Sequence, residues 1–156
     1  MQVLANHIVQ FFREQGFVIV STIDADGSLH SSCKGIVKID QKGAVYLLDL
    51  YRGRTYANLK RNARISITAV DEHKFTGFAL KGKARIMPQK ELDARIMQAW
   101  ESRITARLTR RLIKNIREEK GHSRHPEVLL PKPEYLIVMK VEEVVNLTMQ
   151  QIKEEV

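Results

Sequence analysis

The sequence of 156 residues contains a single cysteine, Cys33, together with four prolines and eight glycines. One cysteine excludes an intrachain disulfide framework and a zinc site built from several cysteines. It fits a reducing compartment, and we expect a cytoplasmic protein. So little proline and glycine excludes collagen-like and low-complexity chains. Hydrophobic residues make up 44% of the sequence, which is too much for a disordered chain.

Long hydrophobic runs are also absent, and none approaches the roughly 18 residues that a membrane-spanning helix needs. Residues 1–16 have no basic start, and Arg13 and Glu14 follow a short apolar stretch, so this segment does not resemble a signal peptide. We therefore expect no membrane segment. The length suits one domain, which we assign to residues 1–156.

Acidic residues are outnumbered, and the net charge is +8. Residues 52–64 contain five basic residues and no acid, and residues 89–125 contain ten basic and five acidic residues. A basic surface attracts phosphates, polyanionic cofactors and nucleic acids alike. The second segment has little aromatic content and no helix-turn-helix or RNA-binding motif, so nucleic acid is the less favoured partner.

The hydrophobic pattern predicts an antiparallel meander that follows a helix. Apolar residues at helical spacing indicate a helix over residues 2–15. Apolar and β-branched runs indicate strands over residues 17–23, 29–39, 44–50, 64–70, 75–87 and 134–142, and a short helix over residues 53–62. Turn sequences fill residues 24–27 and 40–43. Short strands with tight turns predict a mainly β fold with helices (α+β), built as a small antiparallel barrel.

Residues 89–125 form a predicted helical insertion. Apolar residues recur there at every fourth position: Leu92, Ile96, Trp100, Ile104, Leu108, Leu112 and Ile116. Such a stripe drifts by about 40° around the helix axis at each step, so one flat interface does not accept it. We therefore expect the helix to break near residues 102–109. The loop beyond it contains His122 and His125, which are weak candidates for haem iron or a metal because no third ligand is near.

Residues 50–55 (LYRGRT) lead from a predicted strand into the short helix. The first turn of a helix offers free backbone N–H groups and the positive end of the helix dipole to an anion. Arg54 adds charge-assisted hydrogen bonds, and Thr55 adds a hydroxyl donor. These residues suit a phosphate group. They also suit a solvated basic turn in which Thr55 caps the helix.

Two predicted strands carry polar side chains whose pattern suits either a ligand-binding role or a purely structural one. The run Ser31-Ser32-Cys33-Lys34 suits either a flat ligand lying against the strand or a barrel strand with one polar face. Cys33 has no base partner in the sequence, which argues against a nucleophile. On the strand predicted over residues 75–87, basic side chains alternate and therefore share one face, which suits an anionic substrate groove or a solvated surface. They are Lys81, Lys83 and Arg85.

Residues 17–87 resemble the FMN-binding split-barrel proteins of the pyridoxamine 5'-phosphate oxidase superfamily, above all its small single-domain members. Four features carry the resemblance in order: the Asp-Gly turn at 24–27, the polar strand at 30–39, VYLLDLYRGRTYANLKRNARISI at 45–67 and TGFALKGKARI at 76–86. The third is the most specific, because Arg54-Thr55 with Asn58-Leu59 and Asn62 is similar to the family pattern. The resemblance implies a six-stranded antiparallel split β-barrel with an N-terminal helix and a helical insertion.

The resemblance also implies a homodimer with FMN at the subunit interface. In that arrangement the basic turn holds the FMN phosphate, the polar strand lies along the flavin, and the backbone of residues 48–50 approaches the flavin ring. The implied cofactor-binding residues are Ser32, Cys33, Lys34, Leu48, Asp49, Leu50, Arg54, Thr55 and Asn58. The sequence identifies no catalytic acid or base and no metal ligand.

The activity implied by the resemblance is that of an FMN-dependent oxidoreductase with an unknown electron donor and an unknown small-molecule substrate. Pyridoxamine phosphate oxidases end in a segment whose Trp and Arg grip the substrate phosphate, whereas residues 136–156 contain neither residue type. This difference argues against pyridoxamine phosphate as the substrate. The open alternatives are a non-catalytic flavin carrier or electron-transfer protein, and a split barrel that binds a deazaflavin or haem.

Overall fold

The computed structural model describes residues 2–116 and 133–148, which form three α-helices and a seven-stranded antiparallel sheet. The strands are β1 (Val18–Ile23), β2 (Leu29–Lys34), β3 (Ile36–Ile39), β4 (Ala44–Leu48), β5 (Arg64–Asp71), β6 (Thr76–Pro88) and β7 (Tyr135–Asn146). The helices are α1 (Asn6–Arg13), α2 (Arg54–Arg61) and α3 (Ala94–Ile116), and a 3₁₀ turn, η1 (Gln89–Glu91), precedes α3. The predicted α+β class is confirmed.

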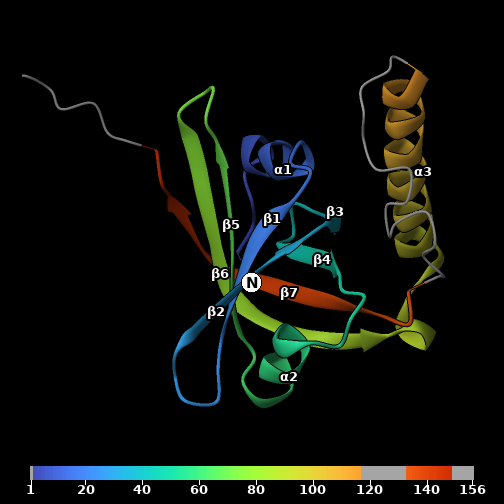
Figure 1. Cartoon of the computed structure of the whole chain (residues 1–156). Helices are drawn as coiled ribbons and strands as arrows, with labels where there is room; N and C mark the ends of the chain where they lie inside the picture. Colours follow the sequence, from blue (N-terminus) through green and yellow to red (C-terminus); the bar gives the residue numbers. More distant parts are fainter. Residues whose placement is uncertain (1, 117–132, 149–156) are drawn as a thin grey trace, which may run out of the picture.

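The strand order across the sheet is β2-β1-β5-β6-β7-β4-β3. β2 and β3 therefore lie at opposite edges of the sheet, although Gly35 alone separates them in the sequence. The Gly35 carbonyl accepts a hydrogen bond from the backbone N–H of Leu48 at 2.9 Å. Because the chain passes from one edge to the other at this point, the sheet curls into a half-barrel (Figure 1).

This arrangement corrects the predicted strand count. The single strand expected over residues 29–39 is two strands, because β2 pairs with β1 while β3 pairs with β4. The apolar pattern reports burial, but it does not report a change of pairing partner within a continuous run. The described sheet thus has seven strands rather than six, and its last strand continues past residue 142 to Asn146.

The main core lies between α1 and the inner face of the curled sheet. Ile8, Val9 and Phe12 are buried on one face of α1, and they belong to one apolar cluster with strand residues such as Ile67 and Leu80. Burying one large apolar side chain stabilises a fold by about 1.5–3 kcal/mol. This cluster therefore fixes α1 against the sheet (Figure 1).

Helix α3 runs without interruption from Ala94 to Ile116, so the predicted break near residues 102–109 is wrong. The segment contains no glycine or proline to interrupt a helix. Its first turns place Ile96 and Trp100 in a second apolar cluster outside the main core, with Val37 and Leu136 of the sheet. His122 and His125 lie outside the described residues. No helix in the described part of the chain has the length and hydropathy of a membrane span.

Candidate functional site

The N-terminal end of α2 gathers the predicted phosphate ligands. No side chain caps this helix end, and no acidic residue occupies its first turn. Arg54 keeps 65% of its side chain exposed. Thr55 does not cap the helix: it is buried, and its hydroxyl lies 3.0 Å from the hydroxyl of Ser32 on β2. Free helix N–H groups, a guanidinium and two hydroxyls thus lie together, and this set of donors suits an oxyanion.

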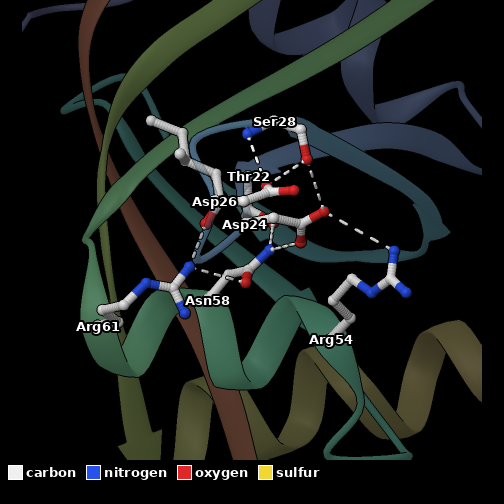
Figure 2. Close-up of polar contacts among 8 residues, drawn as sticks. Thr22, Asp24, Asp26, Ser28, Arg54, Asn58 and Arg61 are labelled. Carbon is white, nitrogen blue, oxygen red and sulfur yellow. Dashed lines mark hydrogen bonds and ion pairs between the residues drawn. The ribbon is translucent and has the colours of Figure 1, made fainter.

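The side chain of Asn58 connects α2 to the hairpin formed by β1 and β2, as Figure 2 shows. Its nitrogen donates hydrogen bonds to Thr22 Oγ1 at 3.0 Å and to Asp24 Oδ1 at 2.9 Å. Its oxygen accepts a hydrogen bond from Arg61 at 3.0 Å, and Arg61 also donates to the Ile23 carbonyl. Because Asn58 is buried and its polar atoms are all bonded within the protein, it holds the helix in place against the hairpin.

Asp24 links this network to the predicted phosphate ligand Arg54. Its Oδ2 lies 3.7 Å from the guanidinium of Arg54 and 3.4 Å from the hydroxyl of Ser28 (Figure 2). In the same turn, Asp26 accepts hydrogen bonds from the hydroxyl and the backbone N–H of Ser28, and these bonds lower the pKa of Asp26. Gly27 has a φ of 85°, as a tight turn requires. The predicted Asp-Gly turn is therefore confirmed, and it places a carboxylate beside Arg54.

A second polar group lies where β2 meets the residues that follow β4. Lys34 Nζ donates to Asp49 Oδ1 at 2.8 Å, and the Tyr135 hydroxyl donates to Asp49 Oδ2 at 2.7 Å. The side chains of Lys34 and Asp49 are 12% and 4% exposed. Burial, with the hydrogen bond to Asp49 and its negative charge, raises the pKa of Tyr135. Both oxygens of a buried carboxylate are thus bonded, while Leu48 and Leu50 on either side of it are half-buried.

The predicted residues of β2 divide between its two faces. Ser32 points toward Thr55, and Lys34 points toward Asp49. Cys33 lies between them in sequence and is exposed on the opposite face, as the alternation of a strand requires. The structure therefore brings Ser32 and Lys34 to the same side as α2 and the end of β4, and it leaves the Cys33 thiol on the other side.

Sequence reasoning missed four contributors to these networks: Thr22, Asp24, Arg61 and Tyr135. Thr22 had a local signal, because it is a polar residue at an inward position of an otherwise apolar strand, and it is buried. The sequence places Asp24 in the turn and Arg61 in the basic segment, but it indicates no partner for either. Tyr135 lies 86 residues from Asp49, and no local spacing indicates a contact over such a separation.

The curled antiparallel sheet, with a basic turn that enters a short helix beside β2, defines a small split-barrel protein. The profile of the pyridoxamine 5'-phosphate oxidase family matches residues 4–146, so the chain belongs to this family. A search of curated protein sequences found no match.

Several solved structures share the fold. HupZ from Group A Streptococcus is 19% identical, with a TM-score of 0.65, and the match covers 93% of this chain and 95% of that one. HutZ from Vibrio cholerae, described as a heme storage protein, is 18% identical with a TM-score of 0.53, over 93% and 94% of the two chains. An F420 reductase is 15% identical with a TM-score of 0.55, over 92% and 98%. Identities this low establish the fold alone.

Proposed function

We propose that the chain is an FMN-binding flavoprotein that acts as an oxidoreductase. The observation that carries the proposal is the group of donors at the start of α2, formed by Arg54, Thr55 and Ser32. A phosphate monoester is an oxyanion that guanidinium, hydroxyl and helix N–H groups bind well. Arg54 fits this role because its side chain is exposed, and its ion pair with Asp24 is long, at 3.7 Å.

In this proposal the protein binds and orients the cofactor, and FMN, when bound, supplies the hydride and electron transfer that side chains do not provide. Arg54 and Thr55 hold the phosphate. Lys34 and the backbone of residues 33 and 48–50 lie along the flavin, while the Cys33 thiol is exposed on the other face of β2. Because Lys34 is already paired with Asp49, we expect its charge to make a small contribution to the redox potential of bound FMN.

We also propose that a second copy of the chain completes the site. Phe17, Ile19 and Val70 are large apolar residues that are exposed on the outer surface of β1 and β5 or next to it. In the register of these strands Ile19 is opposite Thr68 of β5, and on its other side it is opposite Cys33 of β2. An apolar patch of this kind on a sheet marks an interface. Sedimentation should therefore detect a dimer, and Ile19→Asp should weaken it.

The test is a titration with FMN, followed by the quenching of flavin fluorescence, in parallel with riboflavin, which lacks the phosphate. We expect Arg54→Ala to weaken FMN binding about tenfold or more and to leave riboflavin binding nearly unchanged. The matched control is Arg52→Ala, because Arg52 is also exposed but is paired with Glu134 at 2.8 Å. Equal losses for FMN and riboflavin would contradict the assigned phosphate site.

Absorption spectra also distinguish FMN from haem and from a deazaflavin as the ligand, and an oxidoreductase from a flavin carrier. A strong Soret band after addition of haem, or selective binding of a deazaflavin, would favour the chemistry named for HutZ or for the F420 reductase. If FMN binds but neither NADH nor NADPH reduces it, the protein is better described as a flavin carrier or an electron-transfer protein. Reduction by one of them supports the oxidoreductase.

A further inference from the structure

The outer face of β5, β6 and β7 carries a row of three cations. Arg64 on β5 is directly opposite Lys83 on β6, and Lys83 is directly opposite Lys140 on β7. Directly opposite side chains of antiparallel strands stand on the same face, with Cβ atoms about 5 Å apart. All three residues are exposed. Like charges in this position destabilise a sheet, so the row costs stability until an anion neutralises it.

The neighbouring cations on β6 are balanced by acids. Lys81, two residues before Lys83, lies 3.8 Å from Glu143. Arg85, two residues after Lys83, lies 2.9 Å from Glu91. Within residues 2–116 and 133–148, no acid forms an ion pair with any member of the row of three. On β6, Lys83 therefore lies between two cations that each have an acidic partner, Lys81 and Arg85.

The backbone fixes the register that creates this row. The pairing of β6 with β7 shifts between Lys81 and Gly82, and this shift places Lys83 opposite Lys140. A side chain at Gly82 would collide with the carbonyl oxygen of Lys140, so the close approach of the two strands depends on this glycine. The three cations are thus held side by side by the sheet itself.

The row borders a cavity of about 610 Å³. Arg64 and Lys83 line it together with Arg61 and Asn62 at the end of α2. The cavity is shallow and open to solvent, with enough room for a small ligand to enter from the surface. The cavity adjoins the C-terminal end of α2, whereas the candidate phosphate site is at the N-terminal end, about 12 Å away along the helix. The two sites share Asp24, which lines the cavity and lies 3.7 Å from Arg54, but their cations lie at opposite ends of α2.

Asp24 is the acidic residue that lines the cavity, and its carboxylate is already in use. One oxygen accepts from Asn58 at 2.9 Å, and the other lies near Ser28 and Arg54. Arg61 donates to Asn58 and to the Ile23 carbonyl through one nitrogen, Nη2. The other N–H groups of Arg61 take no part in these two bonds. The cavity wall therefore carries three cations, Arg61, Arg64 and Lys83, against the single acid Asp24 among its described lining residues.

We propose that this cavity and the adjoining row form a second anion-binding site, which takes a small molecule with two or more phosphate or carboxylate groups. The outer members of the row, Arg64 and Lys140, are two strand spacings apart, or about 10 Å. One phosphate does not span that distance, whereas an extended polyanion does. Lysine and arginine side chains bind oxyanions through charge-assisted hydrogen bonds.

The binding test is isothermal titration of the full chain with tripolyphosphate and, separately, with citrate, at constant ionic strength. We expect Lys83→Gln to weaken binding about tenfold or more, and the matched control Lys81→Gln to change it less than about twofold. Stronger binding of one probe identifies phosphate or carboxylate as the preferred group. Equal losses in the two variants would reveal diffuse charge attraction and would overturn the site.

Two further arms separate this site from its alternatives. Because Arg54 is also a candidate phosphate ligand, the titration is repeated with Arg54→Ala. Persistence of one binding event that Lys83→Gln removes supports a separate site, and loss of all binding in Arg54→Ala overturns it. A DNA duplex that binds through Lys83 while both small probes fail to bind would also overturn the small-molecule proposal.

The melting temperature gives an independent readout. Without added anion, Lys83→Gln should raise Tm by about 1–3 °C, because it removes two like-charge contacts. Lys81→Gln should not raise Tm, because it removes the pair with Glu143. Tripolyphosphate should raise Tm more in the wild type than in Lys83→Gln. A lower Tm in Lys83→Gln without anion would show that the row is not repulsive, and the proposal would fail.

Discussion

The side-chain nitrogen of Asn58 donates a hydrogen bond to the Asp24 carboxylate at 2.9 Å, across 34 residues of sequence. This bond joins the helix that begins with Arg54 to the turn whose carboxylate lies beside Arg54. The position of the candidate phosphate ligand therefore depends on a buried amide one helical turn further along α2. An exposed arginine at a helix end acquires a defined place in this way.

Replacing Asn58 by alanine should lower the free energy of unfolding by about 1–3 kcal/mol, because the buried hydroxyl of Thr22 and the partly buried carboxylate of Asp24 lose a donor. FMN affinity should fall as well, since the position of Arg54 is then less fixed. Urea denaturation measures the first effect. Asn6→Ala is the control, because Asn6 is exposed and has a long contact of 3.4 Å with Gln41. A similar loss in both variants would contradict the assigned role.

The buried pair of Lys34 and Asp49 should show strong coupling. Lys34→Met should cost about 3–5 kcal/mol, because it leaves the Asp49 charge buried with one remaining donor, Tyr135. Asp49→Asn in the same background should recover a large part of that loss, since no buried charge then lacks a partner. A double-mutant cycle measures the coupling. Additive effects would show that the pair contributes little.

Stability should fall in alkaline solution because the pKa of Tyr135 is raised by burial. An unfolded tyrosine loses its proton near pH 10, whereas the folded one keeps it. The contribution of Tyr135 is therefore complete below about pH 10 and is lost as the pH rises beyond it. Tyr135→Phe should be less stable at neutral pH and should decline less steeply above about pH 10. Parallel declines of the two proteins would contradict the assignment.

Gly82→Ala should destabilise the chain by about 3 kcal/mol or more, because the added methyl group collides with the Lys140 backbone and the sheet must shift. Gly16→Ala provides a matched control, since an added Cβ there has no neighbour within 4 Å. It should change stability by less than about 1 kcal/mol. Thermal unfolding of the two variants measures the difference, and equal melting temperatures would refute the proposed close approach.

The sequence predicted an element correctly where its residue pattern fits only one kind of secondary structure. The alternation from Val18 to Ile23 and the run from Ala44 to Leu48 each form one strand at the expected place. The change of partners at Gly35 was not predictable, because it depends on which strands lie at the edges of the finished sheet. The continuous α3 shows that a drifting apolar stripe alone does not break a helix that lacks glycine and proline.

The candidate site divides in the same way. Ser32 and Thr55 each belong to a local motif that suggested a cofactor contact, but the 3.0 Å contact between their hydroxyls comes from the packing of α2 against β2. The partners of Asp49 were out of reach, because Tyr135 comes from a strand that joins β4 through long-range pairing. Local motifs thus indicated candidate residues at the start of α2, and tertiary packing decided which of their charges are neutralised.

The most direct test of flavin binding is the visible absorption spectrum of the purified protein after it is mixed with FMN and passed through a gel-filtration column. We predict that flavin absorption bands elute with the wild-type protein and are lost from Arg54→Ala under the same conditions. A folded wild-type protein that leaves the column without flavin would contradict the proposal.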